Sequence, residues 1–123
     1  MDPREVYLRY VRAGIAGDPD AQAGVFAQDG VLESPLATGS YPPRVEGRAA
    51  IRDFIAGLHA QANRPPVDTG ASRYALHVSA EDDTDVLVAE LDVTFVGGGT
   101  MSLVQIFRIR GGEVVLMRDY FRA

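Results

Sequence analysis

One carboxylate stands out among the residues that could do chemistry. The sequence ends VVLMRDYFRA, so Asp119 interrupts an otherwise apolar run close to the C-terminus. Charged side chains are rarely buried without a partner, and a carboxyl group in an apolar pocket has its charged form desolvated. Desolvation raises the pKa of such a group toward working pH and makes general acid or base catalysis available. The direction in which Asp119 points therefore decides whether it is a catalytic candidate.

Other catalytic chemistries find little support. The two histidines, His59 and His77, have no second ligand at metal spacing, and the third helix predicted below places His59 at the edge of its apolar face. No serine lies in a nucleophile motif. The glycines at 97–99 precede an expected strand, whereas a phosphate loop precedes a helix, so they predict a hairpin turn. We therefore expect no metal and no cofactor.

Composition narrows the class of protein. The 123 residues predict a single domain, 1–123, and the absence of cysteine excludes disulfides and thiolate chemistry. A net charge of −5 argues against a nucleic-acid partner. The N-terminal sequence lacks the features of a signal peptide, and no stretch is long and apolar enough to cross a membrane. We expect a cytoplasmic location, with no nucleic-acid or membrane partner.

Helix signals dominate the first half. Asp2 followed by Pro3 predicts a helix start, and Gly17 predicts its end. The pair Asp18 and Pro19 predicts a second helix, which carries an apolar patch at 25–26 and extends to residue 30. A short extended piece and a long loop rich in proline, glycine and serine follow. Helical periodicity returns over 47–61 and is expected to end at the prolines at 65–66.

From residue 73 the periodicity is that of strands, joined by tight turns. Within the strand at 85–96, alternation gives one apolar face that includes Leu91 and Val93, and places Glu90 and Asp92 on the other face. We therefore expect an α+β domain with helices on one face of a strongly bent antiparallel sheet. Its four strands are predicted at 73–80, 85–96, 100–110 and 113–121.

Alternation alone does not orient the last strand. Asp119 shares one face with Val115, Met117 and Phe121, and the opposite face carries Leu116, Arg118 and Tyr120. Both faces are apolar enough to be covered, one of them by a second subunit. Because Leu116 and Tyr120 would otherwise be exposed, we expect a homodimer.

Three segments together resemble the SnoaL-like and ketosteroid isomerase-like branch of the nuclear transport factor two-like superfamily. They are FAQDGVLESP, VEGRAAIRDF and VQIFRIRGGEVVLMRDYF, in the expected order and spacing. The resemblance implies a cone in which a curved antiparallel sheet wraps three helices and encloses an apolar pocket. Its register also implies that Met117, Asp119 and Phe121 face that pocket.

The resemblance also implies roles for single residues. The catalytic aspartate of isomerase-like members is replaced here by Ser34, and their oxyanion-binding acid by Val104, whereas their first-helix tyrosine is matched by Tyr10. SnoaL-like polyketide cyclases use an acid in the stretch that reads RDYF here, which is Asp119. Their partner histidine would fall near Val104 or Gln105, and this chain has none there. A steroid isomerase mechanism is thereby disfavoured.

We interpret the chain as a cofactor-independent enzyme of polyketide cyclase or isomerase type that acts on a small apolar organic ligand. Asp119 would transfer a proton and Tyr10 would donate a hydrogen bond to a ligand oxygen. One alternative is a limonene epoxide hydrolase-like enzyme using Glu90 and Asp92, which conflicts with strand alternation; another is a non-catalytic ligand-binding or dimerisation module. The expected pocket residues are Phe26, Ser34, Phe54, Leu58, Leu91, Val93, Val104, Met117 and Phe121.

Overall fold

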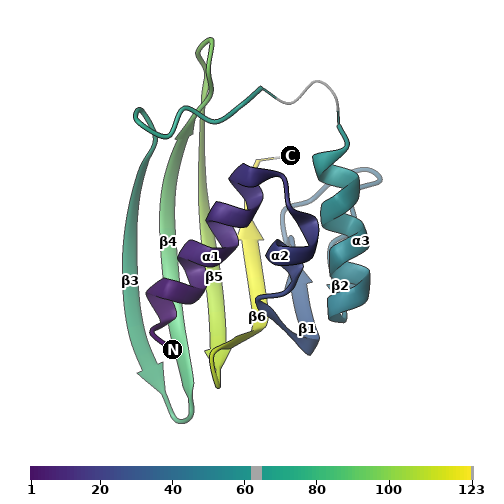
Figure 1. Cartoon of the computed structure of the whole chain (residues 1–123), viewed down its shortest axis with the longest axis vertical. Helices are drawn as coiled ribbons and strands as arrows, with labels where there is room; N and C mark the ends of the chain where they lie inside the picture. Colours follow the sequence, from purple (N-terminus) through teal and green to yellow (C-terminus); the bar gives the residue numbers. More distant parts are fainter. Residues whose placement is uncertain (62–64, 123) are drawn as a thin grey trace.

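A computed structural model describes residues 1–61 and 65–122, and it shows three helices packed on one face of a curved six-stranded sheet (Figure 1). The strand order across the sheet is β2-β1-β6-β5-β4-β3. We call the face covered by the helices the inner face and the opposite one the outer face. The elements are α1 (Pro3–Ala16), α2 (Pro19–Ala23), β1 (Phe26–Glu33), β2 (Arg44–Glu46), α3 (Arg48–His59), β3 (Arg73–Glu81), β4 (Thr84–Thr94), β5 (Thr100–Arg110) and β6 (Glu113–Tyr120).

The first helix has the predicted ends. The Asp2 side chain accepts a hydrogen bond from the backbone N–H of Arg4 at 2.9 Å, which satisfies one of the free donors of the first turn. Gly17 ends α1 in the left-handed conformation, with φ 69°. Tyr7 and Val6 are the buried anchors of this helix against the sheet.

The second helix is shorter than the sequence predicted. Asp18 caps α2 as expected, through a 3.0 Å hydrogen bond from the N–H of Ala21, but the helix ends at Ala23. The prediction that it continues to residue 30 was wrong, because Phe26 already begins β1 and is fully buried. Pairing with the distant β6 therefore overrides the local helix signal in this segment.

Two other boundaries in the first half differ from expectation. Part of the predicted long loop forms β2, an edge strand paired with the end of β1. The N–H of Ser34 donates to the carbonyl of Pro43 at 2.8 Å and closes the base of the remaining loop. Helix α3 ends at His59, before the prolines that were expected to terminate it, and buries Ile51 and Ile55.

The four predicted strands form β3 to β6 as an antiparallel meander. Gly111 and Gly112 have φ of 58° and 78°, the left-handed values that the tight turn between β5 and β6 requires. The glycines at 97–99 join β4 to β5, which confirms a turn rather than a phosphate loop. Because β1 pairs with β6 in parallel, the bent sheet is mixed and not purely antiparallel.

A bulge changes the alternation of β6. Ile109 pairs with Val114 and Arg108 with Leu116, so one extra residue lies on β6 between these pairs. Val114 and Met117 are consequently both fully buried, whereas Val115 is half-buried. The prediction that Val115 shares the face of Met117 by strict alternation was therefore wrong, because Val115 is the extra residue of the bulge. From Leu116 to Tyr120 the pairing is regular and alternation holds.

Candidate functional site

The structure places Asp119 on the inner face. Asp119 pairs across strands with Gln105, and two residues away Met117 pairs with Phe107. Met117 and Phe107 are fully buried and Gln105 is 8 % exposed. Because residues two apart on a strand share a face, Asp119 lies on the side of the sheet that the helices cover. Asp119 therefore shares the inner face with Met117.

Gln105 contacts Asp119 directly. Its side-chain Nε2 donates a hydrogen bond to Asp119 Oδ1 at 3.4 Å, a long contact for a hydrogen bond of this kind. The resemblance had placed a missing histidine at 104–105, and the structure shows that a carboxamide occupies that place beside the acid. Gln105 was thus near a predicted site position, but its hydrogen bond to Asp119 was not foreseen.

Ser34 lies on the other side of Asp119. In the parallel pairing, Leu32 is aligned with Met117 and Glu33 with Arg118, so the next step along both strands brings Ser34 beside Asp119. Ser34 is fully buried, and its Oγ has no hydrogen-bond partner among residues 1–61 and 65–122. Ser34, just after β1, Asp119 of β6 and Gln105 of β5 therefore form a row, which we call the polar row.

Aromatic side chains flank the polar row in both directions along the strands. On one side the Tyr10 ring packs edge-on against Phe26 and Phe107, with centroid separations of 6.2 and 5.4 Å. On the other side Phe121 contacts Tyr41 at 5.1 Å. The polar row is thus set between two aromatic clusters.

Tyr41 was missed as a site residue. It lies in the loop after Ser34, and its ring contacts Phe54 of α3 at 5.4 Å as well as Phe121. Loop residues carry no periodicity that would assign them to a face, so nothing in the sequence linked Tyr41 to the site. Through these two contacts the loop is fastened over the end of β6.

Most expected wall residues lie at the inner face, with one exception. Leu91 packs against the buried core, whereas Leu58 and Val93 are half-buried. Val104 was expected to line the pocket, but it is 37 % exposed and pairs with Glu90 and Tyr120 on the outer face. Val104 precedes Gln105 by one residue, and neighbouring strand residues point to opposite faces, so its side chain lies on the face opposite to that of Asp119.

Glu90 and Asp92 are exposed, as alternation predicted. Glu90 Oε1 lies 2.8 Å from Nε2 of His77, and Asp92 accepts a 2.6 Å hydrogen bond from Ser102 Oγ. Both carboxylates therefore face away from Asp119. An epoxide hydrolase-like arrangement that brings the three acids together is not formed.

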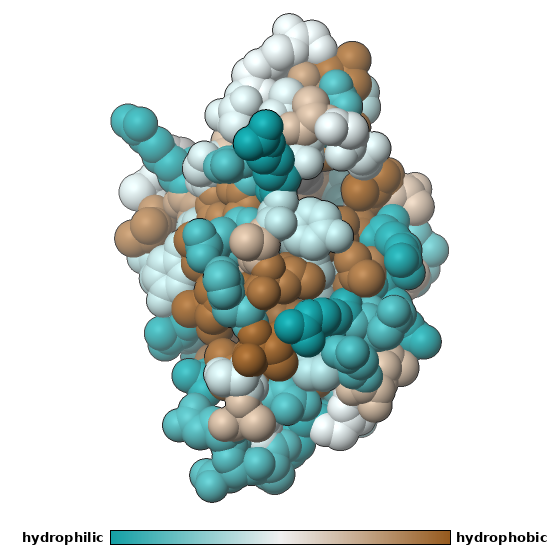
Figure 2. Space-filling view, turned by 90° about the vertical axis from the view of Figure 1, so that its left-hand side faces the viewer, coloured by the Kyte–Doolittle hydropathy of each residue, from teal (hydrophilic) through white to brown (hydrophobic). Residues whose placement is uncertain are grey.

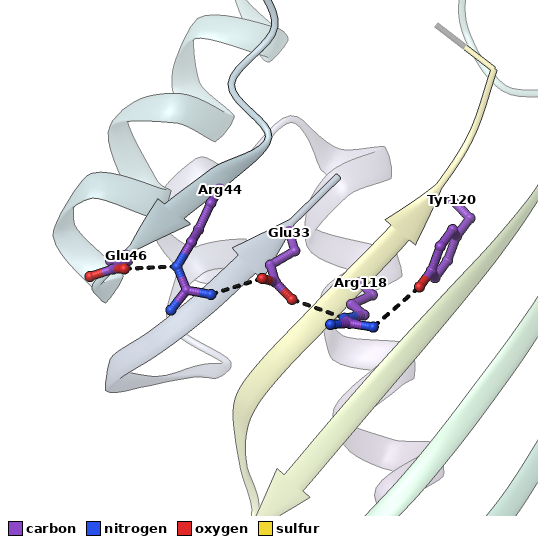
Figure 3. Close-up of polar contacts among 5 residues, drawn as sticks. All are labelled: Glu33, Arg44, Glu46, Arg118 and Tyr120. Atoms are coloured by element: carbon purple, nitrogen blue, oxygen red, sulfur yellow. Dashed lines mark hydrogen bonds and ion pairs between the residues drawn. The ribbon is translucent and has the colours of Figure 1, made fainter. Parts of the chain in front are cut away.

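The outer face carries a chain of charged contacts across β2, β1 and β6 (Figure 3). Glu33 accepts hydrogen bonds from Arg118 at 2.9 Å and from Arg44 at 2.8 Å, and Arg44 also contacts Glu46 at 2.7 Å. The hydrogen bond from Arg118, followed by that from Arg44, lowers the pKa of Glu33 against the opposing effect of burial. Arg118 continues the chain to the hydroxyl of Tyr120 at 3.4 Å.

Near these charges lies a groove of about 730 Å³, whose lining includes residues of both faces. Val104, Tyr120, Ser102, Glu90 and Asp92 contribute from the outer face, together with Leu91, Phe121 and the loop residues Leu36 and Thr38. Figure 2 views the molecule from the side where β3 lies in Figure 1, and it shows apolar surface gathered in the middle, bordered by hydrophilic surface. Surface of this kind is typical of interaction sites.

Comparison with known proteins gives the family and the fold. The SnoaL-like domain matches residues 7–117. No helix within the described residues is long and apolar enough to cross a membrane. Among curated proteins, none matches the chain with significance.

Solved structures resemble the chain over almost its whole length. An isomerase candidate from Bacillus subtilis is 24 % identical, with a TM-score of 0.67 over 98 % of this chain and 89 % of that one. A ketosteroid isomerase-like fold protein from Catenulispora acidiphila, solved with trimethylamine, is 18 % identical, with a TM-score of 0.65 over 98 % and 87 % of the two chains. A protein of unknown function from Nostoc punctiforme has a TM-score of 0.71 at 15 % identity, over 96 % and 86 %. These likenesses establish the fold alone, whereas the sequence match covers most of the chain, which therefore belongs to the SnoaL-like domain family.

Proposed function

We propose that this protein is a cofactor-independent enzyme of cyclase or isomerase type, in which Asp119 transfers a proton to and from a small apolar ligand. The observation that carries the proposal is the position of Asp119 on the covered inner face, between two aromatic clusters and beside the buried Gln105. A carboxylate next to apolar walls is a stronger base than one in water, because its charged form is poorly solvated.

The reaction class follows from what one carboxylate can do. Asp119 takes a proton from a carbon or oxygen of the ligand, and the carboxyl group so formed returns that proton to another atom. Substrate and product then have the same composition, and no oxidant or reductant is consumed. Tyr10, whose ring borders the site, donates a hydrogen bond to a ligand oxygen in this proposal.

Proton exchange tests the proposal without knowledge of the natural substrate. A panel of small enolisable ketones in deuterium oxide would be followed by NMR, because base catalysis replaces their acidic hydrogens by deuterium. We expect the protein to accelerate exchange for members that fit between the aromatic clusters, and Asp119→Asn to lower the rate roughly 100-fold or more. The matched control is Asp92→Asn, which removes an exposed outer-face carboxylate and should leave the rate unchanged.

Two outcomes would count against catalysis by Asp119. If Asp119→Asn exchanges as fast as the wild type, another group is the base. If the wild type binds panel members, seen as NMR line broadening, but accelerates none of them, the rival function gains support. That rival is a ligand-binding module without turnover, and it is favoured by Ser34 and Val104 standing where the resemblance places acids.

We also propose that the outer face forms a homodimer interface. Val88, Ile106 and Leu116 are half-buried on this face and Val104 is 37 % exposed. The border carries both acids and arginines, so two copies related by a twofold axis can place opposite charges against each other. Placing a charge inside this apolar area should separate the copies, because it would be buried without a partner.

Light scattering tests this interface directly. We expect the mass of a dimer for the wild type, and a monomer for Val104→Glu. Ala50→Glu, on the exposed side of α3, is the control and should remain dimeric. A wild-type mass of one chain at all concentrations would refute the proposal.

A further inference from the structure

The position of Gln105 in the polar row suggests a role for this residue. Gln105 is 8 % exposed, and in the register of β4 and β5 it lies between Asp119 and the fully buried Ala89. A carboxamide in such a place must have hydrogen-bond partners, because leaving its polar groups unpaired inside the protein is costly. Its Nε2 group is directed at Asp119 Oδ1.

We infer that Gln105 is a positioning residue: its carboxamide donates a hydrogen bond to Asp119 and holds that side chain, in its ionised form, as the proton acceptor of the first step. The inference rests on the proposed function, which it deepens by assigning Asp119 the role of base. Gln105 itself does not contact the ligand in this inference and acts through the carboxylate.

The chemistry of the carboxamide supports this assignment. A histidine at this place would gain and lose a proton between pH 5 and 8, and could pass that proton to the ligand. An amide does not titrate, so its N–H is a donor at every pH at which the protein is folded. A donor to a carboxylate stabilises the ionised form and opposes the effect of burial.

Ser34, the third member of the polar row, also carries no charge. Ser34 is a neutral hydroxyl, so neither in-row neighbour of Asp119 changes its charge between acid and neutral pH. Among the described residues, the titratable groups near this face include Tyr7 and Tyr10 on α1, Tyr41 in the loop and His59 on α3, whose Nε2 lies 2.9 Å from Oε1 of Gln22. The charged residues of these helices are Glu5, Arg4, Arg9 and Arg12 on α1 and Arg48, Arg52 and Asp53 on α3. Within the polar row, the carboxyl of Asp119 is thus the only group that can accept a proton at neutral pH.

Titration of Asp119 tests the inference separately from activity. The carboxyl carbon of Asp119 would be followed by ¹³C NMR against pH in the wild type and in Gln105→Met, which keeps the length of the side chain and removes the donor. We expect the apparent pKa of Asp119 to rise by about 0.5 to 1 unit, since one hydrogen bond of modest strength to this half-buried carboxyl is lost. The acid limb of the exchange rate should move to higher pH by the same amount.

A matched control and a second variant complete the design. Ser102→Ala removes the donor to Asp92 on the outer face of the same strand, and should leave the titration of Asp119 unchanged. Gln105→His restores a donor of similar size and keeps the experiment decisive if Gln105→Met does not fold. With histidine, the apparent pKa of Asp119 should lie at or below the wild-type value.

The outcomes separate this inference from the proposed function. An unchanged Asp119 titration in Gln105→Met, or a raised pKa in Gln105→His, would overturn the role of Gln105 even if Asp119→Asn abolishes exchange. If Asp119→Asn leaves exchange intact, the proposed function fails, whatever the titration of Asp119 shows. A purely structural Gln105 would change stability without moving the titration, which also contradicts the inference.

Discussion

Replacing Gly30 by alanine should destabilise the protein, because β1 and β6 come too close there to admit a methyl group. A Cβ on Gly30 would lie 2.9 Å from the carbonyl oxygen of Val114, 3.0 Å from that of Ala27 and 3.3 Å from Cβ of Phe26. Two of these atoms belong to the backbone, so the strands themselves must move by a few tenths of an ångström. We expect a loss of about 1 to 3 kcal/mol in the free energy of unfolding, as for other overpacked interiors.

Gly57→Ala is the matched control, since the same methyl group is added in open space. No atom lies within 4 Å of a Cβ at Gly57, which is exposed inside α3. Alanine should raise the free energy of unfolding by about 0.5 to 1 kcal/mol, because glycine loses more backbone entropy in a helix. The two variants should therefore shift stability in opposite directions.

Urea unfolding followed by circular dichroism at one protein concentration would measure both shifts. The fixed concentration matters because dimerisation would make stability concentration-dependent. With equal m-values, the midpoint should fall for Gly30→Ala and rise for Gly57→Ala. A Gly30→Ala midpoint equal to that of the wild type would refute the argument, because it would mean that the strands separate at no cost.

Two further predictions concern pH. The contacts with Arg118 and Arg44 lower the pKa of Glu33 below its usual 4.5, so they add stability that is present above pH 4.5 and is lost as pH falls through the lowered value. Glu33→Gln should therefore have a free energy of unfolding lower than that of the wild type at neutral pH, by up to about 1 kcal/mol. This difference, measured by urea unfolding, should disappear in acid. A difference that stays constant with pH would contradict the prediction. Burial raises the pKa of Tyr7 to about 12 from 10.0, so stability should fall as pH rises above 10, and Tyr7→Phe should reduce that loss in an alkaline unfolding titration. If both proteins unfold at the same alkaline pH, Tyr7 is not the group responsible.

Much of the fold could be predicted because its signals are local. The cap at Asp2, the left-handed Gly17 and the glycine turn at 111–112 are each specified by neighbouring residues, and all three are observed. Strand alternation also held along β4, where Leu87 and Ala89 are fully buried and Glu90 is exposed. Short-range chemistry is sufficient for such features.

The features that were missed depend on contacts distant in sequence. Phe26 was assigned to a helix because Asp18 and Pro19 are good helix starters, and nothing nearby reveals that β6, almost 90 residues later, will pair with it. The strand β2 has three residues, too few for a pattern. The bulge that buries Val114 exists only in the pairing of β5 with β6.

In the candidate site, too, features set by neighbouring residues were predicted better than features set by distant contacts. Alternation placed Asp119 on a face with Met117, and the resemblance chose the inner face for both, as the structure does. Val104 was placed on that face by alignment, although its distance of one residue from Gln105 puts it on the other. No periodic signal exists for Tyr41. Residues on strands were thus assigned better than residues in loops, and a shift of one position was enough to mislead.

The neighbours of Asp119 are set by the strand register as much as by their own identities. Arg118 and Asp119 are adjacent in sequence and opposite in charge, yet Arg118 is directed outward to Glu33 while Asp119 lies on the inner face. The acid therefore lies between Ser34, one position past the end of β1, and Gln105 of β5, and both of these residues are neutral. A slip of one residue between β1 and β6 would replace Ser34 by Glu33 beside it, a like charge that would raise its pKa. The register of β1 on β6, which is regular from Val31 to Glu33, thus determines which side chains lie next to the acid.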